Sequence, residues 1–337
     1  MTILFVGAED CDISYRNGIV FDTSTANVRR TAYARGAIAG WGQDPSTDPN
    51  TGRATFAKWA SASSSFWVSF QYTNMLRAVN NTQVFVFRDA SGVARLMLRG
   101  TGGAAYKLSK RNAAGTITDI GTFSAGDPYM PSLTKVDLNV NYSSSGSVAL
   151  YLNGTLQATV SGDLLTDANT TLQQFEVGTL GYYGDQKMFI SEVIVATTST
   201  KAMSLATLTS STAGTAQQWT GTATNVNQAS LTDDALYIYS ATANQVQQYK
   251  PASLPSGTFS VAAVVTAARA LVGATGPQNV AFVSRVGSTD YSSADYAPTT
   301  SFGPVQHIQE TNPSTSSAWS TADLVSTNYQ YGIKSKT

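Results

Sequence analysis

The sequence has few charged residues and, among 337 residues, one cysteine, one histidine and four glutamates. Charged residues make up 12% of the chain, about half the usual share, and 21 Lys+Arg balance 21 Asp+Glu to a formal net charge of zero. No nucleic-acid partner is expected, because phosphate binding requires a surplus of positive charge. The lone Cys11 excludes an internal disulfide and a cysteine-based zinc site, and the lone His307 excludes a multi-histidine metal site.

Long apolar runs are also lacking. No stretch of about 18 apolar residues occurs, so no membrane insertion is expected. The N-terminal segment Met1–Ala8 has no basic residue and too short an apolar stretch for a signal peptide, and it is typical of a first β-strand. We therefore expect a protein made in a cytoplasm and not exported by the general secretory route.

The residues that are plentiful favour β-structure. Hydrophobic residues make up 42% of the chain, with 16 Tyr and 13 Phe, which is enough to form a sizeable core. Good helix formers are scarce, whereas Thr, Val, Tyr and Phe favour strands. The composition predicts an all-β protein with loops rich in Ser, Thr and Gly.

The strongest local pattern is a three-stranded antiparallel meander. Lys135–Tyr142 alternates apolar and polar residues, as a half-buried strand does. Ser147–Leu152 and Thr155–Val160 follow as strands, joined by Asn153-Gly154. Asn-Gly is the preferred pair for a type I′ hairpin turn, because both central residues need positive φ.

Weaker strand signals divide the chain into two β domains. Segments rich in Ser, Thr and Ala at Thr197–Thr200 and Thr207–Thr215 predict a boundary near residue 198, and hence domains at 1–198 and 199–337. Thr31–Ile38 indicates a short helical or extended apolar face. The other strands predicted in the first domain are Ile3–Val6, Ile19–Phe21, Phe66–Tyr72, Gln83–Arg88, Ala94–Leu98, Ala105–Ser109, Gln174–Gly178 and Met188–Ala196. Those predicted in the second are Ala235–Ser240, Gln245–Tyr249, Thr258–Thr266, Asn279–Val286, Val305–Gln309 and Asn328–Lys334.

Four motifs carry a resemblance to a known fold. Val136–Tyr142, Tyr151–Gly154, Phe175–Gly178 and Phe189–Val195 resemble the late half of a concanavalin A-like (laminin G-like) jelly roll. There, a strand is followed by a Tyr-x-Asn-Gly hairpin, a strand that ends in Gly and a closing strand. The resemblance implies a jelly-roll sandwich, followed here by a second, smaller β-sandwich domain.

The two ends of the chain carry a second resemblance. Glu310–Pro313, Ala318–Leu324 and Tyr329–Lys334 are similar to the C-terminus of structural proteins of tailed bacteriophages. The opening Phe5–Asp10 is similar to the start of phage proteins that place a laminin G-like domain before this module. The resemblance implies a virion component and leaves its position on the particle open. Within Ala318–Leu324, Ser320 is expected to cap one helical turn that has Asp323 near its third position.

Carboxylates are the first candidates for chemistry, since many jelly rolls of this class are glycosidases. Those enzymes resemble one another in a Glu-x-Asp-x-x-Glu strand, whose spacing places carboxylates on one face. The sequence has no such strand. Its nearest cluster, Glu9–Asp12, lacks the second Glu, and the adjacent Asp233 and Asp234 would point to opposite faces. We expect no enzymatic activity and no cofactor.

Aromatic loop residues are the candidates for glycan binding without chemistry. Sugar sites combine an aromatic platform with polar groups that fix hydroxyls. Tyr182, Tyr183 and Asp185 lie in the loop before the closing strand, and Trp41 lies in a second polar loop. The alternative is that these aromatic residues pack under loops or against a neighbouring subunit.

Loop aspartates and the lone histidine are further candidates for a site. Asp44, Asp48, Asp163 and Asp167 lie in expected loops and offer oxygens of the kind that Ca²⁺ takes. Because Asp in loops more often forms turns, no metal is expected. His307 is expected to make one ordinary hydrogen bond.

These observations favour a non-enzymatic virion protein of a tailed phage. We expect a tail appendage or tail-tip component, and the alternative is a capsid decoration or head-fibre protein. A different class, a carbohydrate-active enzyme or secreted lectin, would need a catalytic carboxylate pair or an export signal. The expected partners are other virion proteins, further copies of the chain and a host cell-surface glycan, in a virion assembled in the host cytoplasm. No heptads occur, so the chain is not expected to oligomerise through its own coiled coil.

Overall fold

The computed structural model describes residues 1–7, 15–17, 53–74, 81, 83–102, 105–123, 134–177, 188–209, 212–226 and 236–337. Over these residues the chain is built from antiparallel β-strands and two short 3₁₀ turns, η2 (Ala223–Asn225) and η3 (Thr321–Leu324). The predicted all-β class and β-sandwich architecture are confirmed. None of the helices in this part of the chain is long and apolar enough to cross a membrane.

The chain divides into two compact units, Met1–Leu205 (unit 1) and Ala206–Thr337 (unit 2). The sequence places the boundary at residue 198, whereas the structure keeps seven more residues with the first unit. The segment that follows the last strand of unit 1 accounts for this extension, as described below.

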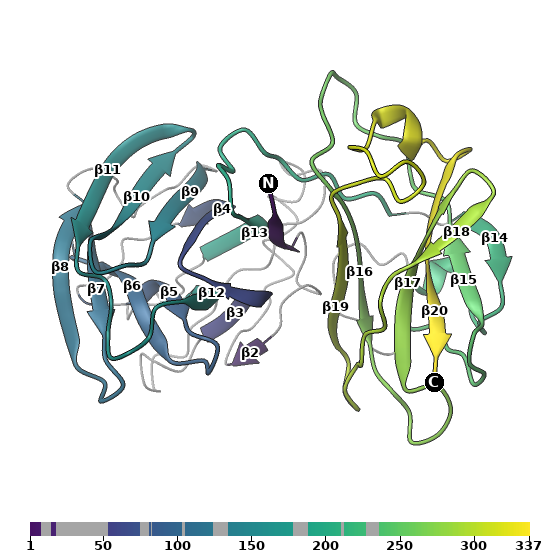
Figure 1. The fold of residues 1–337 in the computed structure, drawn as a ribbon, viewed down its shortest axis with the longest axis horizontal. Coiled ribbons are helices and arrows are strands. Elements are labelled where there is room, and N and C mark those ends of the chain that lie inside the picture. The colour runs from purple at the N-terminus through teal and green to yellow at the C-terminus, as the bar shows by residue number, and fades with distance from the viewer. Residues whose placement is uncertain are drawn as a thin grey trace. The chain divides into compact units, whose positions relative to one another are not determined.

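Unit 1 consists of two antiparallel sheets (Figure 1). The six-stranded sheet has the order β1 (Ile3–Gly7), β13 (Met188–Ala196), β4 (Ser65–Asn74), β9 (Thr134–Asn141), β10 (Gly146–Leu152) and β11 (Thr155–Gly162). The seven-stranded sheet has the order β2 (Tyr15–Asn17), β3 (Arg53–Ser63), β12 (Leu172–Val177), β5 (Gln83–Arg88), β6 (Ala94–Gly100), β7 (Tyr106–Arg111) and β8 (Ile117–Phe123).

Aromatic side chains from both sheets form the core of unit 1. Phe66, Phe70 and Tyr72 alternate along β4 and are fully buried, as the period of a strand requires. The ring of Phe70 lies 5.0 Å from that of Phe85 on β5 and 5.3 Å from that of Phe175 on β12. These contacts join the two sheets into a sandwich.

The predicted meander is confirmed. β9, β10 and β11 pair in sequence as antiparallel neighbours. The turn between β10 and β11 has φ of 48° at Asn153 and 79° at Gly154, as an Asn-Gly turn of this type needs. The backbone N–H and the side-chain Oδ1 of Asn153 also bond to the backbone of Lys135, which fixes the hairpin against β9.

The segment after β13, residues 197–205, is held against β9 by polar contacts. The Lys135 ammonium donates to the backbone carbonyls of Thr200 and Lys201 at 3.0 Å each, and also to that of Met203. Thr200 donates its hydroxyl to Asp137 at 2.7 Å, and both residues are fully buried. These contacts explain why unit 1 continues past residue 198.

Unit 2 also consists of two sheets (Figure 1). The five-stranded sheet has the order β14 (Ala213–Gln217), β15 (Val246–Tyr249), β20 (Tyr329–Lys336), β17 (Asn279–Val286) and β18 (Thr289–Ser292). The two-stranded sheet pairs β16 (Val264–Ala270) with β19 (Gly303–Gln309). Phe282 of β17 stacks on His307 of β19 at 6.4 Å and 9°, so the two sheets face each other.

The core of unit 2 is smaller and is supplemented by buried amides. Trp319, Leu324 and Tyr329 form its main buried apolar cluster. Gln247 and Gln248 are also buried. The Gln247 side chain donates to that of Gln217 and accepts from the backbone N–H of Trp219. The Gln248 side chain donates to Asp290 and accepts from the backbone N–H of Ala216. Because each buried amide has partners, burial of these polar groups is tolerated.

Some predicted strands in unit 2 are wrong in position. Thr258–Thr266 is predicted as a strand, but β16 begins at Val264, because its partner β19 ends at Gln309, directly opposite. Within Ala235–Ser240, only Tyr239 makes a bridge, to Thr220, among the described residues 236–240. The predicted connection Thr207–Thr215 contains the start of β14, whose amides are bonded by side chains of neighbouring strands.

Other differences have the same origin. Composition does not reveal β3, β8, β14 and β18, since each is held in its sheet by pairing with a neighbour rather than by a distinctive apolar pattern. The predicted strand Ile19–Phe21 and the apolar face Thr31–Ile38 lie outside the described residues.

Candidate functional site

The glycan-binding residues that the sequence predicts lie outside the described part of the chain. This holds for Trp41, Tyr182, Tyr183 and Asp185. The carboxylate cluster Glu9–Asp12, with Cys11, and the further aspartates Asp44, Asp48, Asp233 and Asp234 lie outside it as well. Their prediction stays a prediction.

Asp163 and Asp167 are described, and both bond to cations of unit 1. Asp163 accepts from the Lys110 ammonium at 2.9 Å and from the backbone N–H of Leu165 at 3.1 Å. The hydrogen bond from Lys110, more than any other contact, lowers the pKa of Asp163. Asp167 accepts from the Arg95 guanidinium and, at 2.8 Å, from the backbone N–H of Ala113. Both carboxylates therefore fix loops, which is the role expected for loop aspartates.

His307 makes the single hydrogen bond that the sequence predicts. Its Nδ1 lies 3.1 Å from the Tyr296 hydroxyl, and its ring stacks on Phe282. Burial lowers the pKa of His307 and raises that of Tyr296. The pair is therefore neutral near pH 7, with the imidazole enclosed between the sheets of unit 2.

Two carboxylates share one face of the seven-stranded sheet. The register Glu176–Val86–Met97–Ser109–Asp119 places them on one row, four strands apart. At about 4.8 Å per strand, their backbones are roughly 19 Å apart. Glycosidases place their two carboxyl groups about 5–9.5 Å apart, so this row does not form such a pair.

Each of these carboxylates is also held by cations. Glu176, which is buried, accepts a two-pronged bond from Arg88 at 2.6 and 3.2 Å. Asp119 accepts from Arg99 at 2.9 Å, and the hydrogen bond from Ser109 is the largest of the causes that lower its pKa. Within the described residues, no three His, Cys, Asp or Glu side chains converge as metal ligands would.

The described surface of unit 2 carries a cluster of aromatic rings that the sequence analysis did not single out. We name Tyr237, Tyr239 and Phe302 the tyrosine patch. The ring of Tyr237 lies 6.5 Å from that of Tyr239 at 63°, and 5.9 Å from that of Phe302 at 51°. Tyr237 is 51% exposed and Tyr239 is 53% exposed. Leu236, which precedes Tyr237, and Leu271, which directly follows β16, are also exposed.

The local sequence positions the two tyrosines. In an extended segment, alternate residues face the same side, so Tyr237 and Tyr239 point outward while Ile238 between them points inward. Ile238 packs against Gly221, where an added Cβ would lie 2.7 Å from the Ile238 side chain. Tyr239 and Thr220 exchange backbone hydrogen bonds of 2.9 and 3.0 Å, which fix the segment on unit 2. The alternation in Ala235–Ser240 is the signal by which the pair is recognisable in the sequence.

No known protein family model and no curated protein sequence matches the chain. Among solved structures, it is similar to an endo-β-1,4-glucuronan lyase from the fungus Trichoderma reesei, with 13% identity and a TM-score of 0.40, over 58% of this chain and 96% of the lyase. It is also similar to the binding domain of Paraclostridial Mosquitocidal Protein 1, with 12% identity and a TM-score of 0.38, over 60% of this chain and about half (49%) of that domain. The alginate lyase Aly36B is also similar, with 11% identity and a TM-score of 0.34, over 58% of this chain and 98% of the lyase. Likeness at this level carries no information about activity or ligand.

Proposed function

We propose that the chain is a non-enzymatic structural protein of a tailed-phage virion. It is a component of a tail appendage or of the tail tip, where it contacts other virion proteins and a host surface glycan. The sequence resemblance at both ends of the chain supports the virion assignment. Glu176 and Asp119, which are held by cations and whose backbones are roughly 19 Å apart on one sheet face, support a role without catalysis.

One observation carries the proposal furthest: the residues of the C-terminal resemblance build the core of unit 2. Trp319 and Tyr329 contact edge to face at 5.6 Å, and the Trp319 indole donates to the Gln309 carbonyl at 2.9 Å. Ser320 caps η3 by accepting from the Asp323 N–H, as predicted, and Leu324 of that turn is buried. The motif is thus one that specifies a fold, which is what a shared structural module would retain.

The surface of unit 2 supports a role in contacts. Large exposed apolar side chains in this unit include Tyr237, Tyr239, Phe259 and Leu271. Exposed apolar patches on soluble proteins commonly mark interaction sites. The zero net charge of the chain also removes long-range repulsion between copies in an assembly.

The decisive experiment is the copy number of the chain per particle. Particles purified from a producing culture would be analysed by quantitative mass spectrometry, with the major capsid protein as the internal standard. We expect a low copy number, in proportion to known tail components of the same particle. A copy number similar to that of the major capsid protein would replace the tail assignment by capsid decoration. Absence from purified particles would contradict the virion proposal.

A further inference from the structure

We propose that the tyrosine patch is a binding platform for a neutral glycan chain. The inference deepens the proposed function, on which it rests, by assigning the glycan contact to Tyr237 and Tyr239. It differs from the site predicted in the loop around Tyr182, since it lies in unit 2.

The first argument is that the rings are held in place before any ligand arrives. The ring of Tyr237 contacts those of Tyr239 and Phe302, Ile238 packs against Gly221, and the backbone at Tyr239 is anchored by the bridge to Thr220. Binding to such rings loses little side-chain entropy, which favours affinity for a small ligand. Tyrosine also offers an apolar ring together with a polar hydroxyl, and this combination matches a sugar, which has C–H faces and hydroxyl edges.

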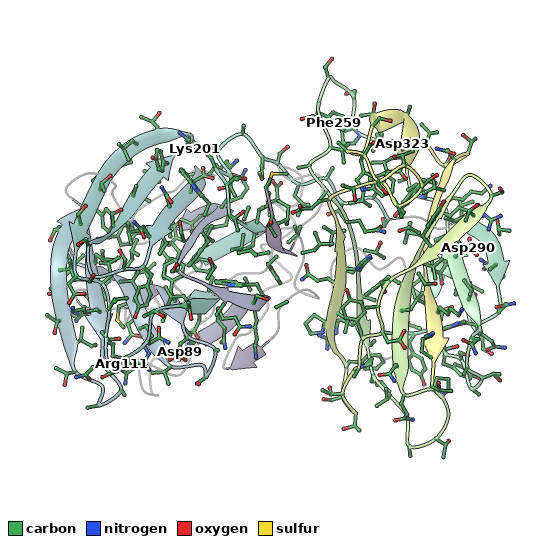
Figure 2. All side chains as sticks on the ribbon, viewed as in Figure 1. Asp89, Arg111, Lys201, Phe259, Asp290 and Asp323 are labelled. Atoms are coloured by element: carbon green, nitrogen blue, oxygen red, sulfur yellow. The ribbon has the colours of Figure 1, made fainter. Side chains whose placement is uncertain are left out.

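The second argument is that the ring faces are not occupied by cations. In the described part of the chain, cation–π contacts involve Lys201 of unit 1, which is labelled in Figure 2 and whose ammonium lies 4.6 Å from the ring centroid of Tyr151. No described lysine or arginine covers Tyr237 or Tyr239 in this way. The Arg269 guanidinium, near Phe302, donates to the Phe302 carbonyl at 3.1 Å. The exposed rings of Tyr237 and Tyr239 are therefore left for a ligand such as a sugar to stack on.

The third argument is size. Two half-exposed tyrosines, Phe302 and the two flanking leucines present on the order of 400 Å² of surface, which is a typical functional patch on a monomer. A stable protein–protein interface needs about 800 Å² from each partner. The patch is thus large enough for two or three sugar rings and too small to hold a second copy of the chain by itself.

The experiment measures binding of neutral hexasaccharides to the full chain. Cellohexaose, maltohexaose and chitohexaose would be tested by saturation-transfer NMR and by calorimetry, with a galacturonate oligomer as the charged comparison. The variants are Tyr237→Ala, Tyr239→Ala and both together. Phe259→Ala is the matched control, because Phe259 is 40% exposed and precedes β16, whereas Leu271 and Phe302 adjoin its other end.

We expect at least one neutral oligomer to bind more tightly than the charged one. The double variant should weaken this binding about tenfold or more, since each stacked ring contributes on the order of 1 kcal/mol. Phe259→Ala should leave it unchanged. Retained binding in the double variant, or no binding tighter than about 1 mM by any neutral oligomer, would overturn the inference. A concentration-dependent dimer that the double variant abolishes would also overturn it, by identifying a second copy as the occupant.

These outcomes are separable from those of the copy-number experiment. If particles contain the chain but the purified chain does not bind neutral glycans, the tyrosine-patch inference alone is overturned. Particles that lack the chain would overturn the virion proposal, whatever the glycan result.

Discussion

The two units of the chain bury their large side chains to very different extents. Of the eleven largest fully buried side chains among the described residues, ten belong to unit 1, and Phe282 is the one in unit 2. Of the nine exposed large hydrophobic residues in the same part of the chain, seven belong to unit 2, although it is the smaller unit. Among the described residues, large apolar side chains are therefore mostly buried in unit 1 and more often exposed in unit 2.

This difference in burial suggests that apolar residues mainly stabilise the fold in unit 1 and are available for contacts in unit 2. Unit 1 has a continuous aromatic core between two broad sheets, so burial alone accounts for its cohesion. Unit 2 has fewer large buried side chains, chiefly the Trp319, Leu324 and Tyr329 cluster and Phe282, together with hydrogen-bonded amides, and several of its other large apolar residues are exposed. This contrast is why we assign the binding surface to unit 2, and it leads to five predictions.

The largest effect is expected for Trp319→Ala. The change opens a cavity in the small core of unit 2 and leaves the Gln309 carbonyl without its indole donor. Substitutions of this kind cost about 3–5 kcal/mol, a large fraction of a small domain's stability. Hydrogen–deuterium exchange with mass spectrometry should show faster exchange across unit 2 and unchanged exchange in unit 1.

Phe70→Ala is the counterpart in unit 1. The cost should again be about 3–5 kcal/mol, because Phe70 contacts both Phe85 and Phe175 in the buried core. Here faster exchange should be confined to unit 1. If either variant accelerated exchange equally in both units, the units would share one folding transition and the comparison would fail.

Charge pairs should also differ between the units. Asp89 and Arg95 form a buried pair at 2.8 Å in unit 1, whereas Asp290 and Arg285 pair at 2.7 Å in unit 2 with a carboxylate that is 39% exposed (Figure 2). Asp89→Ala leaves a buried guanidinium short of a partner and should cost about 3 kcal/mol. Asp290→Ala should cost less, about 1–2 kcal/mol, since solvent screens the exposed ion pair and the main loss is the acceptor of the buried Gln248 amide. Urea titrations measure both, and equal costs would contradict the burial argument.

Acidification should affect the units in opposite directions. Burial keeps the pKa of His307 below its usual value near 6.5, so from about pH 6.5 downward the unfolded chain binds a proton that folded unit 2 does not. Unit 2 should therefore lose stability as the pH falls, until the pKa of folded His307 is passed. Burial raises the pKa of Glu192 in unit 1, so its folded form binds the extra proton and this group adds stability as the pH falls from about 7 toward about 5, before the range in which Asp119 and Asp163, with lowered pKa values, bind protons.

The measurement is local hydrogen exchange between about pH 7 and pH 5, corrected for intrinsic rates, over the window in which an imidazole titrates. His307→Gln should remove the acid sensitivity of unit 2, because a neutral amide replaces the imidazole. Unit 1 serves as the internal control, since His307 is the sole histidine of the chain. Acid sensitivity that persists in the variant would show that another group controls it.

The sequence predicts best where a strand carries its own signal. The alternation of Lys135–Tyr142 and the Asn153-Gly154 turn determine the meander from local chemistry alone. Prediction fails where pairing is decided by a distant neighbour. β14 contains Gly214 and small residues, and its amides are bonded by Gln248 and Gln330, which lie far along the chain. The start of β16 is set in the same way by the end of β19.

The tyrosine patch shows how far such reasoning extends to a site. The alternation of Tyr237, Ile238 and Tyr239 is compatible with a shared face for the two tyrosines, and both are exposed in the structure. The third ring, Phe302, is 65 residues away from Tyr237, and nothing in its local sequence links it to the pair. Conversely, the predicted boundary at residue 198 could not anticipate the contacts that Lys135 and Asp137 make with the following segment.

The most specific effect on binding, with a modest loss of stability, is expected for Gly221→Ala. Gly221 has φ of 115°, which alanine adopts only with strain, and its added methyl group would meet Ile238 at 2.7 Å. Ile238 must move, so Tyr237 and Tyr239 lose the positions that its packing fixes. The cost in stability should be about 1–2 kcal/mol, whereas neutral-glycan binding should fall as far as it does when one tyrosine is removed. Gly257→Ala is the matched control, because Gly257 also has positive φ, at 120°, but has no heavy atom within 4 Å of the added Cβ. Calorimetry with the oligosaccharide that binds the unmodified chain separates the two variants. Equal loss of binding in both would mean that backbone strain, and not displacement of Ile238, controls the patch.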